Sequence, residues 1–118
     1  MLYMQEIRGP ESYKGWAKCW KLYVFVMTLL GAASRVRLAT YAEHVASLAE
    51  RFRDYWWVIS LADVKMRRDH LEHVRRTCIK LHAAGSLPEY NPVHPWDVCY
   101  REAAKDESFW DAEVIPKV

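Results

Sequence analysis

Glycine and proline are both missing from the 53 residues that run from Ala32 to Ala84. Since these two residues are the strongest helix breakers, a stretch of this length without either of them indicates helix. No segment alternates between apolar and polar residues for long enough to predict a strand. The sequence therefore predicts an all-α fold, and its 118 residues suffice for one domain with a modest core. We expect a compact bundle of about four helices.

The sequence also lacks the signatures of most small enzymes. Its three cysteines, Cys19, Cys78 and Cys99, are odd in number and have no CxxC spacing, which predicts reduced thiols in an intracellular protein, cytoplasmic or nuclear. The four glycines are scattered, so there is no glycine-rich phosphate loop, and no HExxH metal motif is present. We therefore expect a protein that is not an enzyme and that needs no metal or cofactor.

Long hydrophobic runs are missing too. The run from Leu22 to Leu30 is much shorter than the ~20 apolar residues that span a bilayer, so we expect no membrane partner. A second interpretation stays open: lysines before this run, and the small residues Gly31 and Ala33 at its end, outline a signal peptide over 22–33. Acidic residues and tryptophans ahead of the run favour a buried helix instead.

Spacing and composition divide the predicted single domain, 1–118, into five segments. The first is an apolar helix over 12–31, and because its second half is apolar on nearly all sides we expect it at the centre of the bundle. A seam helix and then a basic helix follow. Three prolines make the next segment an extended linker, and an acidic helix ends the domain. These last four segments are residues 39–59, 60–85, 86–95 and 96–114.

Capping residues set the predicted helix boundaries. Thr40 and Ser60 are each followed three residues later by an acid, a pattern that resembles the capping box at a helix start. Gly85 is the predicted end of the basic helix, and Pro95 is well placed at the start of the acidic helix. Asp97 would then lie in a first turn, where the helix dipole favours a carboxylate.

An apolar seam follows helical spacing along the two middle helices. It breaks register at Ser60, and Arg67 takes a position where an apolar residue is expected, which favours two helices over one kinked helix. The predicted core residues are Leu38, Tyr41, Val45, Leu48, Phe52, Tyr55 and Ile59, followed by Val64, Leu71, Val74, Cys78 and Leu81.

Charge is distributed unevenly along the chain. Residues 1–85 carry fourteen Lys and Arg against eight Asp and Glu, whereas residues 86–118 carry three against seven. A basic body of this kind hints at a polyanionic partner, RNA or DNA. Asp69 and Glu72 lie among the cations of the basic helix, so a solvated face with internal ion pairs is the other interpretation. The candidate nucleic-acid-binding residues share one sector of the helical wheel: Lys65, Arg68, Arg75, Arg76 and Lys80.

A small metal- or thiol-dependent enzyme is the alternative function. His70 and His73 lie three residues apart beside Asp69 and Glu72, and such side chains share one side of a helix and are common zinc ligands. Cys78 falls on the apolar seam, where a thiol is usually buried and inert. None of these residues belongs to a recognised metal or nucleophile motif, so solvated histidines and a core cysteine are the favoured interpretation.

Three stretches share features with a known family. They are "GAASRVRLATYAEHV", "ADVKMRRDHLEHVRR" with "DYWWVI" just before it, and "PWDVCYREAAKDESFW". In this order, over roughly residues 16–114, they resemble a helical domain found upstream of a CCCH-type zinc-finger segment in retroelement-like polyproteins, a gag-like setting. The resemblance implies self-association or nucleic-acid packaging and no catalytic residues. The sequence has no CCCH cluster, and in that setting direct RNA binding would belong to the finger.

These observations together predict a non-enzymatic helical interaction module that self-associates and is associated with nucleic acid. The expected partners are a second copy of the chain and RNA or DNA. A bundle that binds only other proteins is a further alternative, because the chain is rich in aromatic residues, with six tryptophans and seven tyrosines, and these are common interface anchors.

Overall fold

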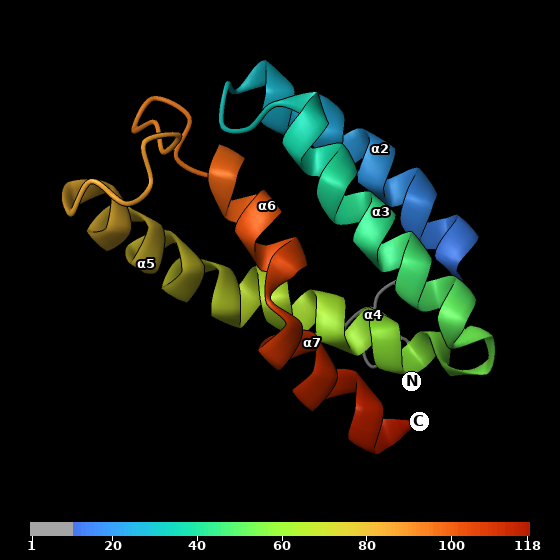
Figure 1. The fold of residues 1–118 in the computed structure, drawn as a ribbon. Coiled ribbons are helices and arrows are strands. Elements are labelled where there is room, and N and C mark those ends of the chain that lie inside the picture. Colours follow the sequence, from blue (N-terminus) through green and yellow to red (C-terminus); the bar gives the residue numbers. More distant parts are fainter. Residues whose placement is uncertain (1–10) are drawn as a thin grey trace.

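The computed structural model describes residues 11–118 (Figure 1). All regular elements in this part of the chain are helical, which confirms the all-α prediction. A π-helical turn joins α4 to α5, so these two helices run as one rod, and residues 11–118 form a bundle of five rods. The α-helices are α2 (Tyr13–Leu29), α3 (Arg35–Arg51), α4 (Trp56–Lys65), α5 (Leu71–Ala83), α6 (Asp97–Lys105) and α7 (Glu107–Val114), with the π turn at Met66–His70.

Polar side chains cap the starts of three helices. Ser12, Ser34 and Asp106 each accept a hydrogen bond from the backbone amide three residues further on, at the starts of α2, α3 and α7. The capping boxes predicted at Thr40 and Ser60 are wrong. Thr40 lies inside α3, where its hydroxyl donates to a carbonyl one turn earlier, and Ser60 is buried inside α4.

The helix boundaries therefore differ from the predicted ones. The break expected at Ser60 lies earlier, where Phe52 leaves helical geometry with φ −122° and ψ 57° and a 3₁₀ turn, Arg53–Tyr55, leads into α4. The acidic helix predicted over 96–114 is divided at Asp106, whose ψ of 74° separates α6 from α7. No residue pattern signals the break at Phe52, whereas Asp106 is a residue type favoured at a helix N-cap.

Glycines end two of the helices. Gly85 has φ 79° and its amide donates to a carbonyl of the last turn of α5, as predicted for the end of the basic helix. Gly31 has φ 70° and ends α2 in the same way. Residues with side chains rarely adopt these angles, so glycine is required at both turns.

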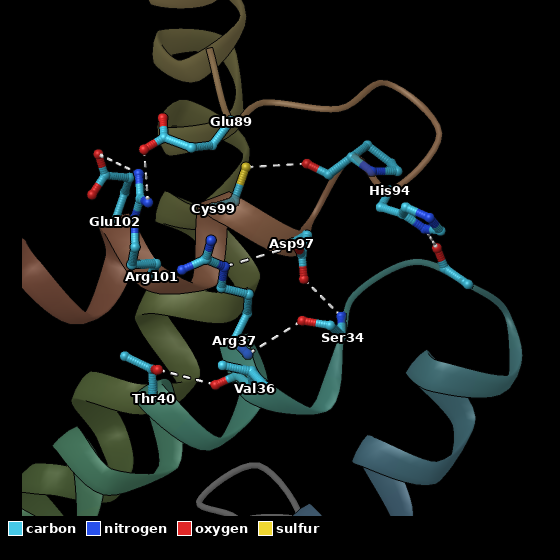
Figure 2. A network of polar contacts seen from close by, with 12 residues as sticks. Ser34, Val36, Arg37, Thr40, Glu89, His94, Asp97, Cys99, Arg101 and Glu102 are labelled. Atoms are coloured by element: carbon cyan, nitrogen blue, oxygen red, sulfur yellow. Dashed lines mark hydrogen bonds and ion pairs between the residues drawn. The ribbon is translucent and has the colours of Figure 1, made fainter. Parts of the chain in front are cut away.

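The start of α6 is tied to the turn between α2 and α3. Asp97, the first residue of α6, accepts a hydrogen bond of 2.7 Å from the backbone amide of Ser34 and lies 3.8 Å from the guanidinium of Arg37 (Figure 2). The ring of His94 contacts the carbonyl oxygen of Gly31 through a short hydrogen bond. These contacts fix the proline-rich segment against the turn.

Most of the predicted seam forms the core. Phe52 is only partly buried and Tyr55 is exposed, because α3 has ended before them, and Leu81 is exposed near the end of α5. Val64 is also only partly buried. The seam residues that the structure buries are Leu38, Tyr41, Val45, Leu48, Ile59, Leu71, Val74 and Cys78.

The apolar helix expected at the centre of the bundle lies at its edge. Figure 1 shows α2 on the outside of the molecule, beside α3. Its inner side buries Trp16 and Trp20, whereas Leu22 and Leu29 on the outer side are exposed. The prediction was wrong because a sequence that is apolar all round does not reveal which side the domain itself covers.

Candidate functional site

A buried carboxylate stands where α2, α3 and α4 meet. Asp63 is 1% exposed, and it accepts hydrogen bonds from the indole of Trp16 at 2.8 Å and from the hydroxyl of Tyr41 at 2.7 Å. Arg67 donates from Nε to Oδ1 at 2.9 Å and from Nη2 to Oδ2 at 2.6 Å. Each carboxylate oxygen is thus bonded twice, as a buried charge requires.

Aromatic rings cover the arginine of this pair. The Arg67 guanidinium lies 5.4 Å from the ring centroid of Trp20 and 5.5 Å from that of Tyr23. Burial lowers the pKa of Arg67, but the hydrogen bond and charge of Asp63 outweigh this and raise it overall. Burial, with Asp63 beside it, raises the pKa of Tyr41. The ion pair and the neutral phenol therefore persist at neutral pH and join three helices.

The candidate nucleic-acid-binding residues lie along the rod formed by α4, the π turn and α5. Arg68 is 65% exposed and contacts its neighbour Asp69 at 2.9 Å, while Lys80 lies exposed in the last turn of α5. The structure thus places all five on one rod, but the four that precede Lys80 take part in ion pairs: Lys65, Arg68, Arg75 and Arg76.

Carboxylates from two elements engage the other three cations. The ammonium of Lys65 lies 2.6 Å from Glu113 of α7. Glu72 forms ion pairs with both Arg75, at 2.5 Å, and Arg76, at 3.4 Å. The hydrogen bond from Arg75 holds the pKa of the Glu72 carboxyl below its usual range. This arrangement is the solvated, internally paired face that the sequence left open, and a phosphate would have to compete with these acids.

Of the two histidines of the alternative metal site, His70 is bound to a carboxylate on another element. His70 Nε2 lies 2.9 Å from Asp106, and its ring lies 5.3 Å from that of His73. The neighbouring carboxylates, Asp69 and Glu72, face arginines instead. Among residues 11–118, no group of three His, Cys, Asp or Glu side chains is arranged to hold a metal ion.

Two buried thiols face each other between α5 and α6. Cys78 is 2% exposed and Cys99 is fully buried. Burial raises the pKa of both thiols, that of Cys99 to about 12, whereas a catalytic thiolate needs a lowered pKa. A pocket of about 320 Å³ opens beside Cys78, and its other lining residues include His73, Thr77, Glu102 and Lys105. With their thiols protonated, these cysteines act as small core residues.

The outer side of α2 is the most unusual surface of the described chain. We define the outer seam of α2 as Leu22, Phe25, Val26 and Leu29, whose exposed fractions are 67%, 58%, 43% and 75%. Their spacing is that of one helix face packing on another helix. A contiguous apolar surface of this kind is typical of a binding site. The sequence prediction did not include this surface, although the second half of the helix is apolar on nearly all sides.

Comparison of the chain with protein families, with curated proteins and with solved structures finds no match. The gag-like resemblance therefore stays a prediction. In the part of the chain that the structure covers, no helix is long and apolar enough to cross a membrane.

Proposed function

We propose that this protein is a non-enzymatic helical interaction module that self-associates through the outer seam of α2. The observation that carries the proposal is the exposure of four large apolar side chains at helical spacing on a helix whose inner side is buried in the domain. Removing apolar surface from water yields roughly 25 cal/mol per Å², so covering this seam supplies a driving force for association.

The other prominent features of the molecule account for its stability. Asp63 accepts hydrogen bonds only from residues of the bundle itself among those described. The thiols of Cys78 and Cys99 are buried, and their pKa values are raised. These groups support a role in holding the fold. The exposed apolar side chains of the outer seam of α2 have no such role in the fold, which favours an interaction module over an enzyme.

Light scattering over two decades of protein concentration tests the proposal. We expect the mass of the wild-type protein to rise with concentration. A variant with Leu22→Gln, Phe25→Gln and Leu29→Gln should stay monomeric with an unchanged circular dichroism spectrum, because these side chains are more than half exposed. Trp57→Gln is the matched control, since Trp57 is 56% exposed on α4 and lies outside the seam. Association that survives in the triple variant would overturn the proposal.

Nucleic-acid association is the second candidate function. It is favoured by the exposure of Arg68 and Arg76, whose side chains remain 65% and 72% exposed within their ion pairs, on the same rod as Lys80. Exposed ion pairs are weak enough for a phosphate to displace the carboxylate. Repeating the light-scattering series with added RNA tests this candidate together with the first.

A further inference from the structure

We infer that the outer seam of α2 packs against the same seam of a second copy, antiparallel, about a two-fold axis that passes between Phe25 and Val26. The inference rests on the proposed function, because it takes association through this seam as given. The new element is that the α2 seam of the second copy lies opposite this seam and that the two helices run antiparallel.

The residue pattern of the seam reads alike in both directions. A leucine stands at each end, and Phe25 and Val26 stand side by side at the midpoint. In an antiparallel pair centred there, Leu22 of one copy meets Leu29 of the other, and Phe25 meets Val26. A two-fold contact requires a surface that is complementary to itself, and a pattern with this symmetry meets the requirement.

The charges of α2 select the antiparallel direction. Lys14, Lys18 and Lys21 all lie in the first nine residues of the helix, and its last turn holds no basic residue. A parallel pair would bring the lysines of both copies together. In the antiparallel pair, Lys18 and Lys21 reach the carboxyl end of the α2 helix of the second copy, where the helix dipole favours a positive charge.

The size of the surface suits a closed dimer. Leu30, the C-cap of α2, and Val36, in the first turn of α3, are also 73% and 71% exposed. Covering these two and the four seam residues would remove on the order of 700 Å² per copy from water, against about 800 Å² per partner in a standard interface. Because a two-fold contact uses the same surface of both copies, assembly stops at two.

Site-directed cross-linking tests the arrangement. In a Cys19→Ser background, which removes the exposed native thiol, single cysteines are introduced as Val26→Cys or Lys18→Cys. A short bis-maleimide should link two Val26→Cys copies, because residue 26 lies next to the axis. It should not link Lys18→Cys copies, because in an antiparallel pair the two residues lie about 22 Å apart along the helices. Adding Phe25→Glu to the Val26→Cys protein should abolish its cross-link.

The outcomes separate failure of the inference from failure of the proposed function. Efficient linking of both cysteine variants would show a parallel pair and overturn the inference. Absence of the Val26→Cys link, or masses well above a dimer, would indicate that the seam contacts a different face of the next copy. In these cases the proposed function stands as long as the glutamine triple variant remains monomeric. A wild-type protein that is monomeric at every concentration would overturn both.

Discussion

Arg67 holds both oxygens of Asp63 from one turn further along the same rod, at 2.9 Å and 2.6 Å. The arginine stands where the apolar seam predicts a hydrophobic residue. Its partner Asp63 also accepts hydrogen bonds from the indole of Trp16 and the phenol of Tyr41, which belong to two other helices. One buried ion pair therefore fixes how α2 and α3 are placed on the central rod.

Asp63→Ala should destabilise the fold strongly. It leaves two buried aromatic donors and the half-buried Arg67 guanidinium without their acceptor, and breaking a buried ion pair typically costs about 3–5 kcal/mol of unfolding free energy. Urea denaturation followed by circular dichroism measures the loss. Asp69→Ala is the matched control, because the contact of Asp69 with Arg68 is exposed, and it should leave the midpoint unchanged. A loss below about 1 kcal/mol for Asp63→Ala would show that the network adds little stability.

Leu38→Ala and Phe52→Ala should differ in cost although both residues belong to the predicted seam. Leu38 is fully buried, so its truncation should cost about 2–5 kcal/mol. Phe52 is the partly buried C-cap of α3, and its truncation should cost only about 1–2 kcal/mol. Equal losses in thermal or urea unfolding would mean that α3 continues past its observed end.

Replacing Arg68, Arg75 and Arg76 with Gln tests the nucleic-acid candidate. The fold should persist, because the three side chains pair with surface carboxylates and only Arg75 is half-buried, over the ring of Trp96. If they contact phosphates, the slope of log affinity against log salt should flatten by roughly two to three units, measured by fluorescence anisotropy with labelled RNA. An unchanged slope in a folded variant would leave the basic helix as a solvated face.

Mild acid should weaken the fold through His44. Its ring packs edge-on against Trp110 at 4.8 Å, its Nε2 is buried without a hydrogen-bond partner among the described residues, and burial lowers its pKa from the ordinary 6.5. Below pH 6.5 the unfolded chain therefore binds more protons than the folded one. The stability contributed by neutral His44 is complete above that pH and is lost as the pH falls towards the folded pKa.

Thermal unfolding between about pH 7.5 and about pH 5 measures this effect. The melting temperature of the wild type should fall over this range by more than that of His44→Gln. His70, which faces Asp106, is unchanged in both proteins, so their difference isolates His44. Parallel pH profiles would refute the assignment.

The core of α3 could be predicted because its period is regular. Leu38, Tyr41, Val45 and Leu48 follow steps of three and four, and a helix of that period buries one face. The break between the two middle helices was recognised but misplaced at Ser60, since α3 already ends at Phe52. A second irregularity was not recognised: the buried residues step by five from Met66 to Leu71, across the π turn, and apolar spacing alone does not locate a π turn.

The candidate site was harder to predict than the core. The ion pairs of the basic rod follow from spacing, since Glu72 lies three and four residues before its two arginines. The contacts of Asp63 with Trp16 and Tyr41 join residues 47 and 22 positions apart, and only the packing of whole helices brings them together. The exposure of the outer seam of α2 likewise follows from the packing of whole helices, because the described helices cover only the opposite side of α2.

The π turn makes the chain tolerant of a change in its own length at one place. It accommodates one residue more than a regular α-helical path would between Lys65 and Leu71. Deleting a single residue there should turn the five-residue step from Met66 to Leu71 into a regular α-helical step of four, so all 13 residues of α5 keep their orientation relative to α4. A deletion inside α5 has no such turn to absorb it and would rotate the residues beyond it by about 100°. A one-residue deletion should therefore do less damage at the π turn than within α5.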